Sequence, residues 1–262
     1  MDLRLSGKTA LVTGASRGIG LAITQALAAE GVRVVAGARN TSAARDTSAG
    51  SELIHPVKAD LSTADGAVSL VEQATELLGG RLDILVNNVG GVHPRPRGFQ
   101  SVTDDSWLET LTINFLAAVR VTRATLPSLL DSRGTIVTIG SVNAVLPDPL
   151  VIDYSAAKAA LASFSKSLSK ELGPRGVRVN TISPGPVETD LWLGAGGVAE
   201  TVGGAQNLTP AQVAEGAVAG IPTGRFTRPD EVADLVLLLA SGRAGNVTGA
   251  DFAIDGGLVS TL

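Results

Sequence analysis

Short apolar runs alternate with longer amphipathic stretches along most of this chain. The short runs are rich in β-branched residues and end at glycine or polar residues, a pattern that predicts buried β-strands. The longer stretches carry apolar residues at helical spacing, which predicts helices. The predicted strands are residues 8–13, 33–36, 53–59, 82–86, 135–139, 177–182 and 250–254. The predicted helices are residues 21–30, 62–78, 104–130, 153–172 and 230–240.

Local signals mark where several of these helices begin or bend. Ser62 and Asp65 have the spacing of a capping box at a helix start. Thr103, which two aspartates follow, predicts the start of the next helix, and Pro127 predicts a break or kink within it. Residues 191–222 are rich in glycine and alanine and have weak periodicity, so no element is assigned to them.

The regular alternation of strands and helices predicts an α/β protein. We expect a Rossmann-type doubly wound parallel sheet of about seven strands, with helices on both faces. The 262 residues show no linker and no shift in composition, so residues 1–262 are assigned to a single domain. Specificity in such folds comes from loops at the carboxyl ends of the strands, and residues 186–222 are the longest candidate, an insertion for the substrate.

Three glycines connect the first predicted strand to the first predicted helix. Gly14, Gly18 and Gly20 have the spacing Gly-x-x-x-Gly-x-Gly. In a strand–turn–helix unit, one glycine allows a sharp turn, another lets backbone N–H groups approach a pyrophosphate, and a third lets the helix pack closely. A glycine triplet alone can be a simple turn, but between a strand and a helix it predicts dinucleotide binding.

Composition and charge narrow the possible functions. The net charge is −4 with no basic block, so we expect no nucleic-acid partner. The absence of cysteine excludes disulfides and thiol catalysis. The two histidines, His55 and His93, lie far apart in the sequence, so no metal site is expected. No apolar run reaches about 18 residues, so we expect a cytoplasmic protein without a membrane span.

Tyr154 and Lys158 are the strongest candidates for chemistry. Residues four apart in a helix lie on one face, so both side chains point into the same space. A free phenol has a pKa of about 10, which a nearby ammonium lowers. This spacing alone more often marks a half-exposed helix face. However, Tyr154 is the only tyrosine in the chain, and it follows Ser141, which ends a predicted strand, by thirteen residues.

A set of motifs in a fixed order identifies a family. These motifs are Thr13-Gly-Ala-Ser-Arg-Gly-Ile-Gly20, Asn87-Asn-Val-Gly90, Asn114, Ser141, Tyr154-x-x-x-Lys158 and Pro184-Gly185. By this set the chain resembles the classical short-chain dehydrogenases/reductases (SDR) over nearly its whole length. One departure is Val89, where the family usually has alanine, and we expect this small apolar change to have little consequence.

The resemblance implies an oxidoreductase that interconverts a ketone or aldehyde and an alcohol by hydride transfer. Tyr154 would be the general acid or base, and Ser141 would hydrogen-bond the same substrate oxygen. Lys158 would lower the phenol pKa and bind the nicotinamide ribose, and Asn114 would hold a water in a proton relay to Lys158. A positioned proton donor contributes about 10²–10⁴-fold to a rate. The implied cofactor-binding residues are Gly14, Ser16, Arg17, Gly18, Ile19, Gly20, Arg39, Asp60, Leu61, Asn88, Gly90, Tyr154, Lys158, Pro184, Gly185, Val187 and Thr189.

Each of these residues, taken singly, also fits a structural role. Ser141 is a possible turn or cap residue, Asn114 a polar residue within a helix, and Asp60 a strand-end cap. Asn87 and Asn88 are both good turn formers. The joint occurrence of the set favours the functional interpretation.

Two arginines indicate which nicotinamide cofactor is preferred. NAD-binding folds usually place an acid after the second strand to hold the ribose 2′-hydroxyl. Here the segment Ala36-Gly-Ala-Arg-Asn40 contains no acid but ends with Arg39 and Asn40, and Arg17 lies in the glycine turn. Two guanidinium groups can bind a 2′-phosphate, so NADP(H) is predicted over NAD(H); the alternative is two solvated surface arginines.

The substrate is less well defined than the cofactor. Apolar residues in the candidate loops predict a pocket for a small or medium apolar carbonyl or alcohol; they are Val142, Val145, Leu146, Leu150, Val151, Trp192 and Leu193. Val142, Leu146 and Trp192 are the substrate contacts that we single out. His93, Arg95 and Arg97 are candidates to meet an anion, although such loop residues are more often solvated.

Two other functions stay open. One is a 3-oxoacyl-(acyl-carrier-protein) reductase, although residues 129–133 are hardly basic and an acidic carrier would favour basic residues there. The other is a non-catalytic NADP(H) sensor or binding protein, against which the intact catalytic set argues. The resemblance also implies a homotetramer whose interfaces use residues 104–130, residues 153–172 and the last strand. Small and apolar residues there are Ala159, Ala160, Ala162 and Phe164, which would equally suit the core.

Overall fold

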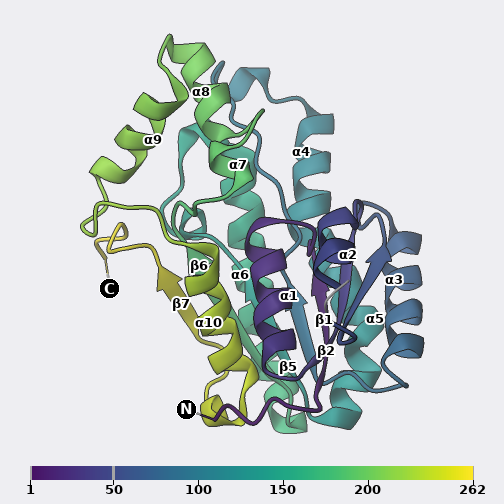
Figure 1. Ribbon diagram of the computed structural model, residues 1–262. Coiled ribbons are helices and arrows are strands. Elements are labelled where there is room, and N and C mark those ends of the chain that lie inside the picture. Colours follow the sequence, from purple (N-terminus) through teal and green to yellow (C-terminus); the bar gives the residue numbers. More distant parts are fainter. Residues whose placement is uncertain (1, 49–50, 262) are drawn as a thin grey trace.

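A seven-stranded parallel sheet forms the centre of the computed structural model, which describes residues 2–48 and 51–261 (Figure 1). The strand order is β3-β2-β1-β4-β5-β6-β7. The strands are β1 (Thr9–Thr13), β2 (Arg33–Ala38), β3 (Ile54–Lys58), β4 (Ile84–Asn87), β5 (Thr135–Ile139), β6 (Arg178–Pro184) and β7 (Asp251–Ile254). All seven were predicted, with ends within two residues. The chain adds β2 and β3 on one side of β1 and then β4 to β7 on the other side, which confirms the doubly wound topology.

Helices cover both faces of the sheet. They are α1 (Gly18–Ala29), α2 (Ser42–Ser48), α3 (Ala64–Leu77), α4 (Asp104–Leu111), α5 (Ala117–Ser132), α6 (Ile152–Leu172), α7 (Asp190–Leu193), α8 (Val198–Gln206), α9 (Pro210–Ala219) and α10 (Pro229–Ala240). Figure 1 shows α1 and α10 in front of the sheet and α3, α5 and α6 behind it. This arrangement confirms the prediction that helices cover both faces of the sheet.

Alternation along the strands builds a separate apolar core on each face. Successive side chains of a strand point to opposite faces. Ala10 and Val12 therefore pack in one core with residues of α1 and α10. Leu11, between them, packs in the other core with residues of α3, α5 and α6. Because both faces of the sheet are covered, its strands read as continuous apolar runs in the sequence.

The predicted start of α4 is confirmed, and the capping residue of α3 lies one residue after the predicted one. Thr103 caps α4, because its Oγ1 accepts a hydrogen bond from the Ser106 N–H at 3.2 Å. The cap of α3 is Thr63, whose Oγ1 accepts from the Gly66 N–H at 3.0 Å, and not Ser62 as predicted. The Ser62 N–H is bonded to Asp60 Oδ1 at 3.0 Å, so Ser62 belongs to the turn before the helix.

The predicted break in the long helix lies elsewhere than Pro127. A π-helical turn, Thr112–Leu116, separates α4 from α5, and α5 continues through Pro127 to Ser132. Such turns are rare and occur often at functional sites. Asn114, the only residue of the turn that is fully buried, is one of the predicted site residues. The helix α2 was not predicted at all.

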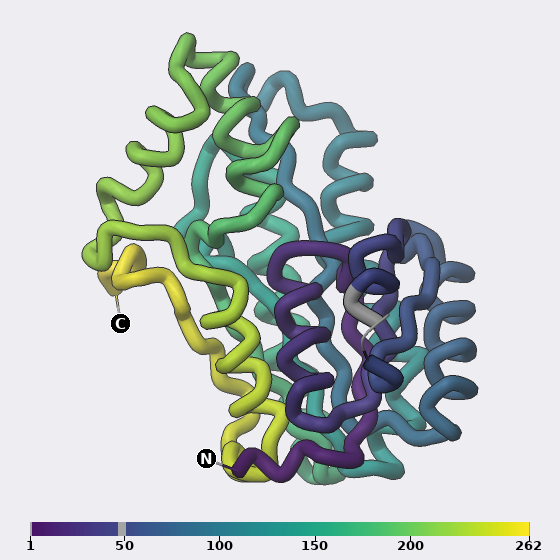
Figure 2. Tube along the Cα trace, viewed as in Figure 1, coloured from purple at the N-terminus to yellow at the C-terminus, as the bar shows by residue number. Residues whose placement is uncertain are grey.

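Residues 190–219 form three short helices where no element was assigned. Figures 1 and 2 show α7, α8 and α9 together beyond the sheet, on the same side of the molecule as α4. At the start of α9, Thr209 Oγ1 accepts from the Gln212 N–H at 3.2 Å, and Gln212 Oε1 accepts from the Thr209 N–H at 2.9 Å. This capping box, with Pro210 as the first helical residue, was a readable signal in the sequence. Within the described residues, no helix is both long and apolar enough to cross a membrane.

Candidate active site

A cavity of about 1030 Å³ lies at the carboxyl ends of the central strands. The glycine turn after β1, the end of β2 and the segments that follow β4, β5 and β6 all line it, and α6, α8 and α9 complete its wall. The four predicted catalytic residues line this cavity. So do all the predicted cofactor-binding residues except Asp60. The structure therefore brings together motifs that lie as far apart in the sequence as Gly14 and Thr189.

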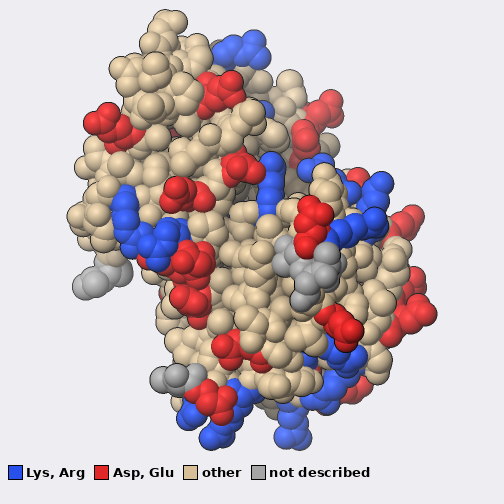
Figure 3. Space-filling view, viewed as in Figure 1, with Lys and Arg blue, Asp and Glu red and all other residues tan. Residues whose placement is uncertain are grey.

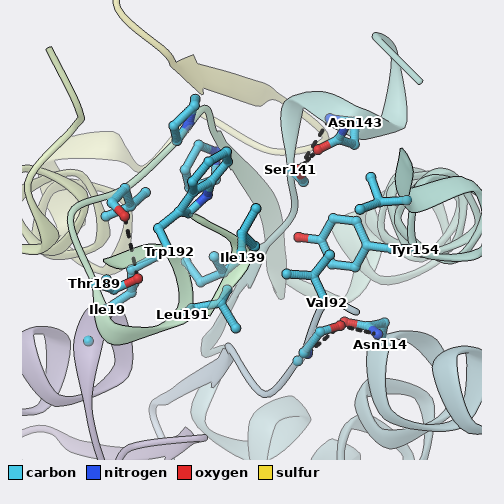
Figure 4. Close-up of a pocket in the computed structure, with 18 of the residues that line it drawn as sticks. Ile19, Val92, Asn114, Ile139, Ser141, Asn143, Tyr154, Thr189, Leu191 and Trp192 are labelled. Carbon is cyan, nitrogen blue, oxygen red and sulfur yellow. Dashed lines mark hydrogen bonds between the residues drawn. The ribbon is translucent and has the colours of Figure 1, made fainter. Parts of the chain in front are cut away.

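Tyr154 and Lys158 lie one turn apart on α6, as the sequence predicted. Lys158 is buried, and its Nζ donates to the Ile139 carbonyl oxygen at the end of β5, at 2.9 Å. The same Nζ is 5.6 Å from the centroid of the Tyr154 ring. Figure 4 shows the Tyr154 hydroxyl pointing into the cavity, with Leu191 and Trp192 on the opposite wall.

Ser141 follows β5 and faces the same space as Tyr154 (Figure 4). Its Oγ accepts a hydrogen bond from the Asn143 N–H at 3.2 Å and lies 3.2 Å from Asn143 Oδ1. The Ser141 hydroxyl therefore caps a short 3₁₀ turn, and it lies near enough to the Tyr154 phenol to influence the phenol pKa. Ser141 therefore does have the capping role that the sequence left open, and this role fixes its hydroxyl at the cavity wall.

Asn114 is held by the loop that follows β4. Its Nδ2 donates to the carbonyl oxygens of Gly91 at 2.9 Å and Thr110 at 3.1 Å, and its Oδ1 accepts from the Gly91 N–H at 3.1 Å. A Cβ atom on Gly90 would lie 2.8 Å from Asn114 Oδ1 and 3.7 Å from Lys158 Nζ. The Asn114 amide and the Lys158 ammonium thus both lie beside Gly90, and the relay water between them stays a prediction.

Burial sets the protonation of the two key groups. Burial raises the pKa of the Tyr154 phenol, and the nearby Ser141 hydroxyl lowers it by less. Burial lowers the pKa of Lys158 to about 8. Lys158 is not among the groups that cause this shift, so its lowering of the phenol pKa stays a prediction. A protonated phenol at neutral pH is the form that a proton donor needs.

The glycine turn forms a cradle that fits a dinucleotide. Gly14 has a φ of +66°, and a Cβ atom on it would lie 2.9 Å from the Val89 Cα. A Cβ atom on Gly20 would lie 2.3 Å from the Gly14 oxygen, so only glycine fits there. The Asn88 Nδ2 donates to the carbonyl oxygens of Thr13 at 2.9 Å and Gly14 at 3.1 Å. The backbone of the turn and the start of α1 are thus fixed at the cavity wall, where they suit a pyrophosphate.

Arg17 and Arg39 line the far end of this cradle, and both are exposed. Asp60 is exposed, follows β3 by two residues and lies outside the cavity lining; its contact with the cofactor stays a prediction. Its carboxylate accepts from the Ser62 N–H at 3.0 Å. Hydrogen bonds from Ser62 and the nearby Arg39 charge hold the pKa of Asp60 below its usual value. Asp60 therefore stays ionised, and its charge interacts with the Arg39 guanidinium.

The other end of the cavity is mostly apolar. The predicted contacts Val142, Leu146 and Trp192 line it, as do Leu150 and Val151. Val145 and Leu193, which were also predicted there, are 69% and 45% exposed and lie outside the lining. Figure 3 shows few charged side chains over α8 and α9. Residues that the sequence analysis did not identify complete this end; they are Val92, Pro94, Asn143, Leu191, Val198, Val202, Gln206, Leu208, Gln212, Val213, Ala217 and Leu258.

The three basic loop residues do not meet this cavity. His93 and Arg97 are exposed, and none of His93, Arg95 and Arg97 lines it. Arg95 instead turns inward, where its Nη2 lies 2.5 Å from Asp153 Oδ2. The suggestion that these residues bind an anion is therefore not supported. Within residues 2–48 and 51–261, no group of three or more His, Cys, Asp or Glu residues could hold a metal ion.

Comparisons with known proteins agree with this arrangement. A sequence model of the family described as short chain dehydrogenase matches residues 8–195. A curated 3-oxoacyl-[acyl-carrier-protein] reductase of Thermotoga maritima is 33% identical and covers 98% of this chain and 100% of its own. A 2,3-dihydro-2,3-dihydroxybenzoate dehydrogenase of Bacillus subtilis is also 33% identical, and the match covers 97% of this chain and 96% of that protein. The L-sorbose reductase of Gluconobacter frateurii, solved with NADPH and L-sorbose, superposes with a TM-score of 0.91 at 32% identity over 100% of both chains. The chain therefore belongs to the short-chain dehydrogenase/reductase family, whose members are oxidoreductases.

Proposed function

We propose that this protein is an NADP(H)-dependent oxidoreductase that interconverts a small or medium apolar ketone or aldehyde and its alcohol. One observation carries the proposal: a single cavity joins the glycine cradle and Arg39 to Tyr154. The cradle and the arginine suit a phosphorylated dinucleotide, and the phenol suits proton transfer to a carbonyl oxygen. The apolar end of the cavity supplies room for the rest of the substrate.

In this proposal the residues of the chain manage the proton and the geometry. The nicotinamide cofactor, when bound, supplies the hydride. Tyr154 donates its phenolic proton to the carbonyl oxygen, and Ser141 donates a hydrogen bond to the same oxygen. Lys158 and Asn114 lie behind Tyr154, where their polar atoms are placed to return a proton to the phenol. In the direction of alcohol oxidation, Tyr154 accepts the proton instead.

The preference for NADP(H) over NAD(H) rests on the end of β2. Arg39 lines the cavity there, and no acid takes the position that usually binds a ribose 2′-hydroxyl. Arg17, from the glycine turn, lines the same cavity. A charge-assisted hydrogen bond from a guanidinium to a phosphate contributes about 1.5–3 kcal/mol, which is about 10- to 100-fold in affinity. The relative solved with NADPH supports this choice.

Arg39→Asp is expected to weaken NADPH binding by about 10- to 100-fold while changing NADH binding little. Nicotinamide fluorescence during titration of the purified protein measures both affinities. Lys58→Asp is the matched control, because Lys58 is exposed at the end of the adjacent strand β3, outside the cavity lining, and the change in charge is the same. If the parent protein binds NADH as tightly as NADPH, the proposed preference is wrong.

A 3-oxoacyl-(acyl-carrier-protein) reductase is the second candidate, and the names of several curated relatives favour it. An acidic carrier steered by basic residues would gain about 10-fold or more in rate over a small thioester. The end of α5 places Asp131 beside Arg133, both exposed, which gives little net positive charge. We expect an acetoacetyl group on the carrier protein and on a short thiol to be reduced with similar kcat/KM. A strong advantage for the carrier would favour this second function.

The family resemblance also favours a cytoplasmic homotetramer, which sedimentation velocity would test. Phe164, one of the suggested interface residues, packs edge-on against Phe115 of its own chain, with ring centroids 6.1 Å apart. Ala159 on α6 is exposed and is available for contact with a second copy. A monomer at micromolar concentration would contradict the proposed assembly.

A further inference from the structure

An ion pair ties the loop after β4 to the first turn of the catalytic helix. Arg95 approaches Asp153 with two nitrogens, Nη2 at 2.5 Å and Nε at 3.2 Å from Oδ2. The Arg95 N–H also donates to the Leu150 carbonyl oxygen at 2.6 Å, just before α6. The loop is therefore fixed to the start of α6 by both its backbone and its side chain.

The carboxylate of the pair is buried, and the guanidinium is half-buried. Asp153 is 1% exposed and Arg95 18%. The same Asp153 oxygen accepts from Thr110 Oγ1 at 2.7 Å. Burial alone would raise the pKa of Asp153, but the hydrogen bonds from Arg95 and Thr110 outweigh it and hold the pKa below its usual value. Asp153 is thus an ionised carboxylate inside the protein, held by partners from two other segments.

This pair connects with the residues of the active site in two places. Asp153 directly precedes Tyr154 in α6. Thr110 is one turn before Asn114, and its carbonyl oxygen accepts from Asn114 Nδ2 at 3.1 Å. Asn114 in turn holds Gly91 at the start of the same loop. The loop is therefore fixed at both ends, by Asn114 at Gly91 and by Asp153 at Arg95.

The loop between these anchors forms part of the cavity wall. Val92 and Pro94 line the cavity, whereas Arg95 does not. Figure 4 shows Val92 beside the Tyr154 ring. We propose that the Arg95–Asp153 ion pair positions Tyr154 and the wall of residues 92–94 for the reaction. Arg95 and Asp153 are then positioning residues, which act through Tyr154 and the loop without touching the substrate.

Energetics favour positioning over simple stabilisation as the role of the pair. A buried ion pair gains little net stability, because removing two charges from water offsets their attraction. What such a pair does provide is a defined geometry, because the two-nitrogen approach of a guanidinium to a carboxylate fixes direction as well as distance. A displacement of about 1 Å in a catalytic group costs about 10²-fold in rate. The expected change in rate rests on the proposed function, whereas the expected change in the placement of Tyr154 does not.

Arg95→Met tests the inference, with Arg97→Met as the matched control. Both changes remove one positive charge from the same loop at a residue outside the cavity lining, but Arg97 is exposed whereas Arg95 is paired with Asp153. Arg95→Met is expected to lower kcat by about 10- to 100-fold and to leave NADPH affinity within about 2-fold. Arg95→Lys keeps the charge and should recover part of the rate. Arg97→Met should behave as the parent protein in every measurement.

A second measurement needs no substrate. Tyr154 is the only tyrosine, so protein grown with ¹³Cζ-tyrosine gives one NMR signal that reports on this ring alone. Arg95→Met should shift or broaden that signal, and Arg97→Met should not. If the parent protein reduces no carbonyl compound, the proposed function fails, and this signal still decides the present inference. If folded Arg95→Met keeps both the parent signal and the parent kcat, the inference is wrong. If Arg95→Met does not fold, Asp153→Asn, which preserves the shape of its side chain, replaces it with the same expected results.

Discussion

Tyr154→Phe is expected to lower kcat for carbonyl reduction by about 10²–10⁴-fold, with NADPH affinity nearly unchanged. Phenylalanine keeps the aromatic ring and removes only the hydroxyl that points into the cavity (Figure 4). The raised pKa of the phenol keeps it protonated at neutral pH, so the parent protein holds the proton that reduction consumes. No other tyrosine is present in the chain to replace it.

Steady-state rates with a set of apolar ketones, together with NADPH titration, measure this effect. Ser167→Ala is the control, because it removes a hydroxyl from the exposed face of the same helix. A Tyr154→Phe variant that turns over like the parent protein would refute the proton-transfer role. A parent protein that binds NADPH tightly but reduces no carbonyl would instead favour the sensor function.

The sheet and the catalytic residues were predictable from sequence because they depend on local signals. Helices cover both faces of β1, so its residues Ala10, Leu11 and Val12 are all apolar. Such a continuous apolar run is a clear strand signal in the sequence. Tyr154 and Lys158 are placed together by helix geometry alone. Gly14 and Gly20 are required by the close approach of backbone atoms within one turn. In each case the signal is either a contact between residues close in the sequence or a repeating pattern of apolar residues.

The features that sequence analysis missed depend on contacts between distant segments. Arg95 and Asp153 are 58 positions apart, and nothing near either residue indicates that the two side chains meet. The π-helical turn at Asn114 is stabilised by the Gly91 backbone, 23 positions away, so Pro127 was the stronger local signal for an irregular helix. Burial likewise emerges only from the complete fold, so the sequence did not indicate that burial raises the pKa of the Tyr154 phenol.

Helices α8 and α9 were missed for a different reason. They are rich in glycine and alanine, and α9 has no fully buried residue, so their apolar positions do not repeat strongly. Both helices line the cavity and do not pack on the sheet. A helix in that place needs only a narrow apolar face, whereas a helix that packs on a sheet needs a broad apolar stripe. Only the capping box of Thr209 and Gln212 marked an element there. The substrate end of the site was therefore the least predictable part of the chain.

Lys158→Met is expected to abolish most activity and, at the same time, to stabilise the protein at neutral pH. Burial lowers the pKa of Lys158 from 10.5 to about 8, so the fold carries the cost of a buried ammonium at pH 7. At about 1.36 kcal/mol per pKa unit, the difference corresponds to about 3 kcal/mol. The lost hydrogen bond to the Ile139 oxygen offsets about 1–2 kcal/mol of this, which leaves a gain of about 1–2 kcal/mol. The rate should fall by about 10²-fold or more, because the phenol loses the group placed to return its proton.

The pH dependence of stability separates this cause from a general effect of the substitution. Below about pH 8 both the folded and the unfolded parent protein carry the Lys158 proton, so the full cost is present. Between about 8 and 10.5 the folded state releases the proton while the unfolded state keeps it, so the parent protein gains stability as the pH rises. Lys158→Met lacks this gain, and its advantage in urea unfolding should shrink between pH 7 and pH 9.5. Lys170→Met, an exposed lysine on the same helix, should show neither the advantage nor its loss. A Lys158→Met variant less stable than the parent protein at pH 7 would show that the ammonium contributes more to the fold than its burial costs.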